Sequence, residues 1–379
     1  MKKFNFRFII AAGFIFLLSA MPSYSAETSV PLGLPQVEYP DANPQTPEKI
    51  DLGEKLFNDK RFSSTGDISC ASCHESTKAF TDSPLKISEG ILKLTGTRNA
   101  PTVVNSAYFE KLFWDGRSPD LEDQALHPFT NPVEMGLKNH QPILDIVRTD
   151  TAYEKLFKDV FGKTGNSVTM KEVTQAIAAF ERTKISGNSP FDRWYYGGEK
   201  DALSPAQKRG FDIFVNKGRC VSCHVIEQTQ ALFTDNRFHN VGVGINNIQA
   251  DVPGLADEFI KAKITATEVD VKVLTDKRTS ELGRFVVTKD FDDLGAFKTS
   301  TLRNIAVTAP YMHDGSLKTL RDVVEHYNNG GISRKGDPVN DFLSGGIRPL
   351  NLRNKDIRDL VSFMEALTSP EFVQKQARK

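Results

Sequence analysis

The stretch Cys70-Ala71-Ser72-Cys73-His74, the first motif, decides the fold, and the stretch Cys220-Val221-Ser222-Cys223-His224, the second motif, repeats its pattern. In each motif the two thiols lie one helical turn apart and can form thioethers with the two vinyl groups of one haem, and the histidine is placed to bind the iron. A zinc site or a redox dithiol is the alternative, but zinc motifs seldom carry histidine at this position and a redox pair would not occur twice. The sequence therefore predicts two covalently attached c-type haems.

The composition excludes several other classes of protein. All four cysteines of the 379-residue chain lie in the two motifs, which leaves none for a disulfide. The chain has 48 basic and 48 acidic residues, so its charge gives no indication of nucleic-acid binding. Its length is typical of two or three domains and allows a sizeable hydrophobic core.

The first residues have the layout of a secretory signal peptide. Lys2, Lys3 and Arg7 precede an apolar run over 8–18, and a short Ser-Tyr-Ser segment follows it. We therefore expect residues 1–25 to be removed and the mature protein to be exported to the periplasm. No later segment is apolar for the roughly 18 residues that a membrane span requires, so we expect no span in the mature chain.

Each half also has the helices that a small cytochrome needs around its motif. In the first half, apolar residues recur at helical spacing before the motif and again near residue 177: Leu52, Leu56, Phe57, Val173, Ile177 and Phe180. In the second half, Ser204 and Pro205 have the pattern of an N-cap and a first helical residue. Apolar stripes follow at Phe211, Phe214, Ile357, Leu360, Val361, Met364 and Leu367. These stripes predict core helices and an all-α fold of two cytochrome c-like domains, over 26–190 and 191–379, with the connection at 186–200.

The two halves resemble each other beyond the motifs, which indicates an internal duplication. Three short matches follow the motifs in the same order: Phe80-Thr81-Asp82 with Phe233-Thr234-Asp235, Arg98-Asn99 with Arg303-Asn304, and Trp114-Asp115-Gly116 with His313-Asp314-Gly315. A charged and Thr-rich insertion from about 242 to 294 has no counterpart in the first half. Its role therefore cannot be inferred from the duplication.

The sixth ligand of each iron separates an electron carrier from an enzyme, because only an open iron can meet a substrate. Tyr327 lies thirteen residues after Asp314, and Pro128 lies thirteen residues after the matched Asp115. Tyrosine can bind iron, whereas proline cannot. The register therefore predicts a second haem that is closed by Tyr327 and a first haem that is open.

Other residues could bind the irons instead. The alternatives for the first haem are Met135, His127 and His140. The alternatives to Tyr327 for the second haem are Met312, His326 and Met364. If a methionine or histidine closed the first haem as well, the protein would be an electron carrier.

These residues give the chain a resemblance to the bacterial di-haem cytochrome c peroxidases, and among them to the MauG-type branch. The resemblance spans nearly the whole mature chain. Besides the two motifs it rests on Arg98-Asn99-Ala100-Pro101-Thr102, Phe113-Trp114-Asp115-Gly116-Arg117, Pro132-Val133-Glu134-Met135, Leu302-Arg303-Asn304 and Thr308-Ala309-Pro310-Tyr311-Met312-His313-Asp314-Gly315. It implies an N-terminal haem that meets peroxide, a C-terminal haem that stores or relays electrons, and one calcium ion between the domains.

The same resemblance implies roles for individual residues. Glu134 and Gln124 lie where the family keeps a distal carboxylate and amide, so Glu134 would carry the proton that peroxide cleavage requires. Trp114 would relay electrons between the haems. The alternatives are a solvated loop carboxylate for Glu134 and a core aromatic for Trp114. The implied calcium ligands, oxygen donors that suit a hard cation, are the side chain of Asn99 and the carbonyl groups of Thr308 and Pro310.

Three positions separate this chain from particular members of the family. The stretch 75–98 contains no histidine, whereas many family peroxidases carry one there that blocks the first iron until the other haem is reduced. We therefore expect no need for reductive activation. Those enzymes close the C-terminal haem with methionine, whereas an oxygen ligand such as Tyr327 favours oxidised iron. MauG has a tryptophan two residues before its second motif, where this chain has Gly218.

The expected function is the reduction of hydrogen peroxide to water with electrons from a small cytochrome c or copper protein. A second hypothesis is the MauG-type reaction, in which the oxidised enzyme modifies a partner protein, although Gly218 argues against the maturation that MauG itself performs. A third hypothesis is a di-haem electron carrier without peroxide chemistry, which would need both irons closed.

Overall fold

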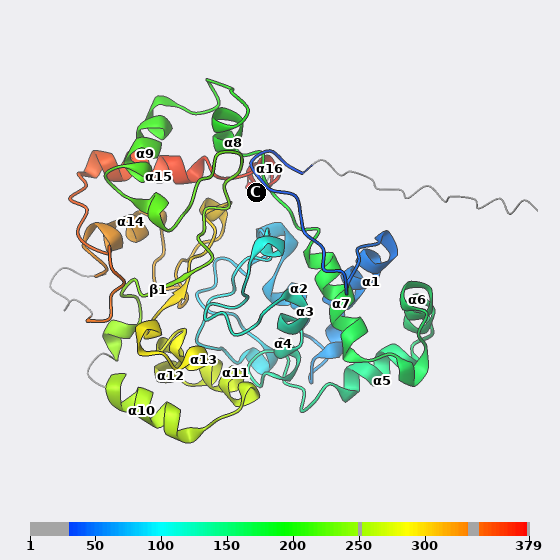
Figure 1. Cartoon of the computed structure of the whole chain (residues 1–379). Coiled ribbons are helices and arrows are strands. Elements are labelled where there is room, and N and C mark those ends of the chain that lie inside the picture. The colour runs from blue at the N-terminus through cyan, green and yellow to red at the C-terminus, as the bar shows by residue number, and fades with distance from the viewer. Residues whose placement is uncertain (1–29, 249–251, 333–340, 377–379) are drawn as a thin grey trace, which may run out of the picture.

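The computed structural model describes residues 30–248, 252–332 and 341–376, which form helices joined by long loops (Figure 1). Within these residues there is one small antiparallel sheet, in which β1 (Phe238–His239) pairs with β2 (Phe297–Lys298). The predicted all-α class is therefore confirmed.

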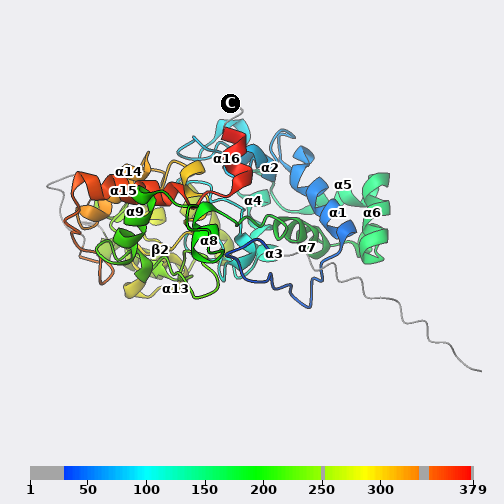
Figure 2. The same ribbon diagram turned by 90° about the horizontal axis from the view of Figure 1, so that it is seen from above.

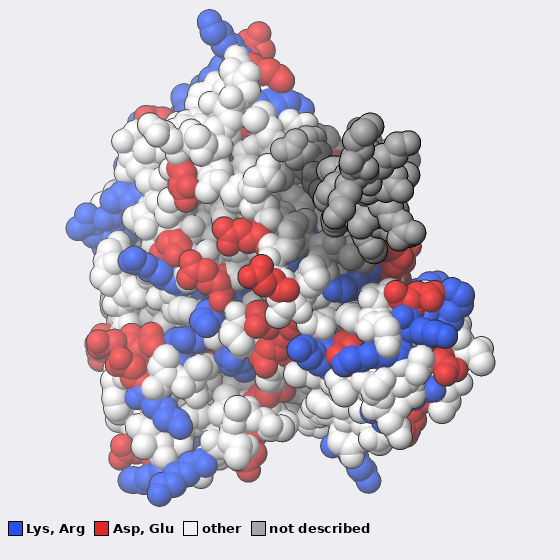
Figure 3. Space-filling model, turned by 45° about the vertical axis from the view of Figure 1, so that its right-hand side comes forward, with Lys and Arg blue, Asp and Glu red and all other residues white. Residues whose placement is uncertain are grey.

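Three expectations from the sequence concern the signal peptide, a membrane span and the surface charge. The predicted signal peptide, 1–25, lies outside the described residues. Among the described residues, no helix is both long enough and apolar enough to cross a membrane. Basic and acidic side chains are interspersed over the face in Figure 3, in line with the equal numbers of the two charges in the sequence.

The first half is built on two helices that cross at a glycine. α1 (Pro47–Asn58) begins after Thr46, whose hydroxyl accepts a backbone hydrogen bond, and proline occupies its first position. α7 (Met170–Glu181) packs against α1. A Cβ on Gly53 would lie 1.9 Å from the carbonyl oxygen of Ala176, so only glycine allows this close crossing. The predicted apolar positions are buried here, which confirms them as core: Leu52, Leu56, Phe57, Val173, Ile177 and Phe180.

The second half repeats this arrangement. α9 (Pro205–Val215) begins after Ser204, the predicted N-cap, and α15 (Asn354–Glu365) crosses it. A Cβ on Gly210 would lie 2.0 Å from the carbonyl oxygen of Asp359, as at the crossing in the first half. The core of this half contains the predicted positions Phe214, Ile357, Leu360, Met364 and Leu367, with Phe211 and Val361 packed at its edge.

Shorter helices complete the two halves. In the first half they are α2 (Cys70–Cys73), α3 (Leu121–Gln124), α4 (His127–Thr130), α5 (Gln141–Thr149) and α6 (Thr151–Phe161). Outside the insertion, the rest are α8 (Pro190–Tyr195), α14 (Leu320–Asn328) and α16 (Pro370–Gln376). Figure 2 shows α1, α5, α6 and α7 at one end of the molecule and α9, α14 and α15 at the other.

Both ends of the described chain cross from one half to the other. The carbonyl oxygen of Gly33 accepts hydrogen bonds from the Ala231 amide and from the Arg303 side chain of the second half. At the other end, Phe372 of α16 packs against Ala79 and Val104 of the first half. The halves are therefore held together by the two ends of the chain as well as by the connection between them.

The structure corrects one of the three repeat matches. Asn105 and Asn304 both have a left-handed backbone, with φ of 64° and 60°, and each precedes a short 3₁₀ helix. The Asn105 amide donates to the carbonyl of Lys184 just after α7, and the Asn304 amide donates to that of Leu367 just after α15. Asparagine tolerates the left-handed conformation. Asn304 is therefore the counterpart of Asn105, and the predicted match with Asn99 is wrong.

The insertion forms a helical unit at the lower left of Figure 1. Its helices are α10 (Val252–Ala262), α11 (Ala266–Thr275), α12 (Lys277–Glu281) and α13 (Phe285–Thr288). They enclose a small core of their own that contains Val252, Ala256, Phe259, Val273, Leu282 and Phe285. The hydroxyl of Thr97 in the first half donates to the carbonyl of Val273 at 2.6 Å. The insertion therefore belongs to the second half in sequence and contacts the first half in space.

Candidate active site

The two motifs hold their histidines in the same way. Nδ1 of His74 lies 3.1 Å from the carbonyl oxygen of Phe80, and Nδ1 of His224 lies 2.9 Å from that of Phe233. A carbonyl can only accept a hydrogen bond, so Nδ1 carries the proton in each ring and Nε2 keeps the lone pair that binds iron. Burial lowers the pKa of both histidines, which also favours the neutral form. The duplicated Phe-Thr-Asp segments thus prepare both histidines as iron ligands.

Helices of the two cores support the motifs. The first motif forms α2, and the second forms a 3₁₀ helix over Cys220–Ser222. The buried Phe57 ring of α1 lies 6.5 Å from the His74 ring, and the buried Phe214 ring of α9 lies 6.5 Å from the His224 ring. Each half therefore presents two thiols, an oriented histidine and an aromatic support, and this donor set fits a c-type haem.

A cavity of about 470 Å³ lies beside the second motif, a volume typical of cofactor pockets. Cys220, Cys223 and His224 line it together with Tyr327 of α14. Burial raises the pKa of Tyr327, and the charges of Cys220 and Cys223 raise it further. The residues around this cavity fit a haem whose iron His224 and Tyr327 could both reach.

Two of the three alternative ligands share this cavity. Met312 and Met364 line it, whereas His326 does not. Nε2 of His326 lies 2.7 Å from the carbonyl oxygen of Val241 instead. The structure thus brings Tyr327, Met312 and Met364 to the second haem site and directs His326 elsewhere.

Trp114 reaches from the first half to the second cavity. It lines the cavity together with Phe113. Its Nε1 donates to the carbonyl oxygen of Asn99 at 2.8 Å, and its ring meets the His313 ring edge-on with centroids 6.5 Å apart. The Phe113 ring meets the ring of His127 in α4 edge-on at 5.4 Å. The Phe113-Trp114 pair therefore joins the surroundings of α4 to the second haem site.

The three implied calcium ligands, Asn99, Thr308 and Pro310, line the same cavity. The Asn99 amide nitrogen donates to the carbonyl oxygens of Leu85 at 3.3 Å and Lys86 at 3.1 Å. In the described part of the chain, no donor bonds to the side-chain oxygen of Asn99 or to the carbonyls of Thr308 and Pro310. Oxygen donors of this kind suit a hard cation such as calcium.

Glu134 lies in a tight turn after α4, close to the first motif. Its backbone amide donates to the carbonyl of Asn131 at 3.1 Å. The chain at Gly90 passes so close that a Cβ there would lie 2.5 Å from the Glu134 carbonyl oxygen. Burial raises the pKa of Cys73 to about 12, and the charge of Glu134 contributes to this rise. The charge of Glu134 thus acts on a thiol of the first motif.

The surroundings of Glu134 suit a proton carrier. Its side chain is half-buried, and burial among protein atoms raises its pKa to about 7. The negative charge of Asp270 raises this pKa as well, while Arg117 and His127 act in the opposite direction. A carboxyl group whose pKa is near neutral can both accept and return a proton.

Gln124 and Pro128 lie on the two short helices before this turn. Gln124 ends α3, and Pro128 lies in the first turn of α4. The half-buried side-chain amide of Gln124 has no hydrogen-bond partner among the described residues. The corrected register, which pairs Asn105 with Asn304, still places Pro128 opposite Tyr327. At this position of the duplicated register, the first half therefore has a proline where the second half has a tyrosine.

The alternative ligands for the first haem have other contacts. Met135 is buried in the core of the first half. Nε2 of His140 lies 3.0 Å from a backbone carbonyl oxygen. The His127 ring lies 3.3 Å from the carboxylates of both Asp123 and Asp270.

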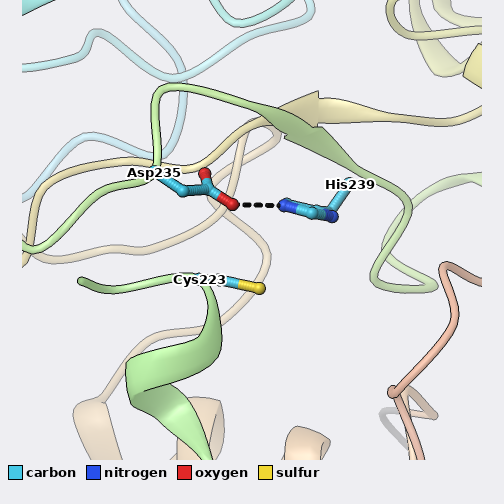
Figure 4. Close-up of side chains that lie close together, drawn as sticks. All are labelled: Cys223, Asp235 and His239. Atoms are coloured by element: carbon cyan, nitrogen blue, oxygen red, sulfur yellow. Dashed lines mark hydrogen bonds and ion pairs between the residues drawn. The ribbon is translucent and has the colours of Figure 1, made fainter.

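A cluster of residue types that bind metals lies beside the second motif (Figure 4). The ligand atoms of Cys223, Asp235 and His239 lie within 4.8 Å of one another. The carboxylate of Asp235 points to the His239 ring, 2.7 Å from Nε2. In a c-type haem site the Cys223 sulfur would form the thioether, which would leave two ligands. We therefore interpret Asp235 and His239 as an ion pair at the edge of the haem cavity.

Sequence reasoning missed several buried polar residues near these sites. Lys298 lines the second cavity, and burial lowers its pKa to about 7. His313 and Glu281 form a buried pair at 2.8 Å, and Asp270 of α11 contacts the first-half residues next to Glu134. Glu281 and Asp270 lie in the insertion, where the duplication offers no matching residue as a signal.

Comparisons with known proteins cover both halves of the chain. Residues 47–201 match the sequence model of a family described as di-haem cytochrome c peroxidase. The methylamine utilization protein MauG of Methylorubrum extorquens is 34% identical over 332 residues, which are 87% of this chain and 81% of MauG. The cytochrome-c peroxidase IdrP1 of a Pseudomonas species is 35% identical over 355 residues, which are 92% of this chain and 88% of IdrP1.

A solved structure extends the similarity to three dimensions. A MauG-like protein associated with microbial copper homeostasis superposes on the chain with a TM-score of 0.72 at 30% identity. The superposition covers 91% of this chain and 96% of that one. The likeness therefore includes both haem motifs and supports the MauG-like branch.

Proposed function

Because this chain belongs to the di-haem cytochrome c peroxidase and MauG family, we propose that it reduces hydrogen peroxide to water with electrons from a small cytochrome c or copper protein. The layout of 1–25 supports the periplasm as its location. Family membership implies two c-type haems. One observation carries the proposal: Tyr327 lines a cavity with the second motif, whereas in the first half Pro128 occupies that register and the charge of Glu134 acts on Cys73. An open iron next to a proton carrier suits peroxide, and a closed iron suits electron storage.

Cleavage of peroxide requires proton movement as well as electrons. When bound, haem supplies the two electrons that split the O–O bond. The ionised Glu134 accepts the proton of one peroxide oxygen and returns it to the other oxygen, which leaves as water. The unpartnered amide of Gln124 orients peroxide through a hydrogen bond. Two electrons from the donor protein and two protons then yield the second water.

The connection between the haems is proposed to run through Trp114. Its indole hydrogen bond to Asn99 fixes the ring, and Phe113 continues toward α4. We also propose one calcium ion at Asn99, Thr308 and Pro310. Such an ion would tie a first-half residue to two second-half residues at the place where the Trp114 indole is held.

Peroxide consumption with a reduced small cytochrome c as donor tests the proposal. We expect sustained turnover, with two donor molecules oxidised for each peroxide. Feeble turnover together with a long-lived oxidised protein would favour the MauG-type reaction. If neither haem gave a high-spin ferric signal, both irons would be closed and the electron-carrier hypothesis would replace the proposal.

The MauG-type reaction is the second candidate function, because Tyr327 at the second cavity is the residue type that this branch uses. Gly218 argues against the maturation reaction of MauG itself, because MauG has a tryptophan at this position. A Cβ on Gly218 would lie 2.8 Å from the carbonyl oxygen of Ile213, so a large side chain would have to displace the backbone. A partner protein would therefore be oxidised by another route than through residue 218.

We expect Tyr327→Phe to change the sixth ligand of one haem only. The phenolate favours ferric iron, so its loss should raise the reduction potential of the second haem and leave the ferric spectrum of the first haem unchanged. Redox titration followed by absorption and electron paramagnetic resonance measures both effects. Met364→Leu is the matched control, because Met364 lines the same cavity. A shift in Met364→Leu or Met312→Leu, with none in Tyr327→Phe, would contradict the assignment.

A further inference from the structure

Helix α11 of the insertion places one buried carboxylate against the first half. Asp270 is 3% exposed. Its oxygen atoms lie 2.8 Å from Nη2 of Arg117, 3.2 Å from Nδ2 of Asn131 and 3.3 Å from Nδ1 of His127. A buried charge is costly unless its partners stay in place, so these contacts fix the three partners relative to α11. All three partners lie in the segment that leads to Glu134.

Asn131 passes this constraint to Glu134. Its side-chain oxygen accepts a hydrogen bond from the Val133 amide at 3.2 Å, and its carbonyl accepts one from the Glu134 amide at 3.1 Å. Its side-chain nitrogen donates to Asp270. Both ends of the Asn131 amide are thus bound, and the turn from Asn131 to Glu134 is held against the insertion.

The apolar core of the insertion reaches the same turn. Val133, directly before Glu134, packs against this core. A second anchor lies at Arg98, whose Nε donates to the Ser280 hydroxyl and whose Nη2 donates to the Ser280 carbonyl, both at 3.1 Å. The insertion is therefore attached to the first half by apolar and polar contacts on both sides of Asp270.

We propose that the insertion is a wall of the peroxide pocket and that Asp270 is a positioning residue, which holds Arg117 and Asn131 so that Glu134 stays beside the first motif. The inference rests on the proposed function, in which Glu134 carries the proton. It also gives a reason why the segment 242–294 has no counterpart. The second haem, closed by Tyr327, takes no peroxide, so no second wall is needed.

Asp270→Asn tests the inference in the haem-loaded enzyme. The new amide can still accept a hydrogen bond from Arg117, but its NH₂ group cannot accept one from Asn131. We expect kcat to fall by roughly 100-fold, as for other displaced catalytic groups, with KM for peroxide unchanged. The affinity of the ferric protein for fluoride is a second measurement, which does not depend on turnover. This affinity should weaken by about tenfold, the worth of one hydrogen bond from the pocket.

Three further variants serve as controls. Asp257→Asn removes the same charge from an exposed position on α10, where Asp257 pairs with Lys261, and should change neither readout. Asp270→Glu keeps the negative charge, so its kcat and fluoride affinity should be close to those of wild type. Asn131→Ala keeps the ion pair between Asp270 and Arg117, so it remains informative if Asp270→Asn does not fold. It should lower kcat by a factor similar to that of Asp270→Asn.

The outcomes separate this inference from the proposed function. Wild-type kcat and fluoride affinity in either Asp270→Asn or Asn131→Ala would overturn the inference. Full activity in Glu134→Gln would overturn the proposed function. An inactive Glu134→Gln beside an unchanged Asp270→Asn would leave the function standing and remove only the role of Asp270.

Discussion

Asp192→Ala is expected to lower the free energy of unfolding by about 3 to 5 kcal/mol. Asp192 and Arg303 form a fully buried ion pair, in which both guanidinium NH₂ nitrogens lie 2.9 Å from a carboxylate oxygen. Arg303 also donates to the carbonyl oxygens of Gly33 at 2.6 Å and Ala231 at 2.7 Å. Without the carboxylate, the guanidinium would stay buried among neutral groups, which costs far more than the loss of a surface pair.

Unfolding of the haem-loaded protein in guanidinium, followed by tryptophan fluorescence and haem absorption, measures this change. Asp212→Ala is the control, because Asp212 is exposed on α9, and it should stay within about 0.5 kcal/mol of wild type. The double variant Asp192→Leu, Arg303→Met should recover only part of the loss, since it removes the unpaired charge but leaves the Ala231 carbonyl without its Arg303 donor. A loss below about 1 kcal/mol for Asp192→Ala would mean that the pair does not hold these segments together.

The helices and haem-binding residues could be predicted because they depend on local patterns. Two thiols and a histidine within one turn define each motif without any distant partner. A cap such as Ser204 and apolar stripes at spacings of three and four predict a helix with one buried face. The comparison of Tyr327 with Pro128 is also local, because it counts residues from one matched turn.

Matching short stretches of sequence can pair the wrong residues of the two halves, because the structural role of a residue also depends on its backbone conformation. Asn99 follows an arginine as Asn304 does, and this similarity produced the wrong pair. Asn105 has no arginine before it, but it shares the left-handed φ of Asn304 and the hydrogen bond to the end of a core helix. The register counted from the matched Asp-Gly turns gives the same pair, because Asn105 and Asn304 lie ten residues before Asp115 and Asp314. The sequence could therefore have identified the counterpart, and the backbone conformation confirms it.

Contacts between distant polar residues could not be predicted. Asp270 lies in a charged segment whose composition indicates solvated surface, yet it is buried against His127. The same holds for Glu281 with His313. Burial of a carboxylate is favourable only when its partner is already in place, and the sequence does not show which of many distant cations that partner is. The contacts of Asp270 with the first half therefore became visible only in three dimensions.

Glu134→Gln should lower kcat/KM for peroxide by about 10²- to 10⁴-fold, the usual worth of a proton carrier. Glutamine keeps the shape of the side chain but cannot accept and return a proton. The covalent haem content and the ferric absorption spectrum should stay as in wild type, because Glu134 does not hold either haem. Stopped-flow mixing of the ferric protein with peroxide measures the rate directly.

The pH profile tells whether Glu134 is the group that titrates. Burial, with Asp270, raises the pKa of Glu134 to about 7, and the carboxylate must be ionised to accept the first proton. In wild type, kcat/KM should therefore fall about tenfold per pH unit below this pKa and level off above it. Glu134→Gln should lose this limb. Glu181→Gln is the matched control, because burial raises the pKa of Glu181 in α7 to about 8. If the limb instead disappeared in Glu181→Gln and persisted in Glu134→Gln, the proton carrier would be Glu181, and Glu134 would only shape the pocket.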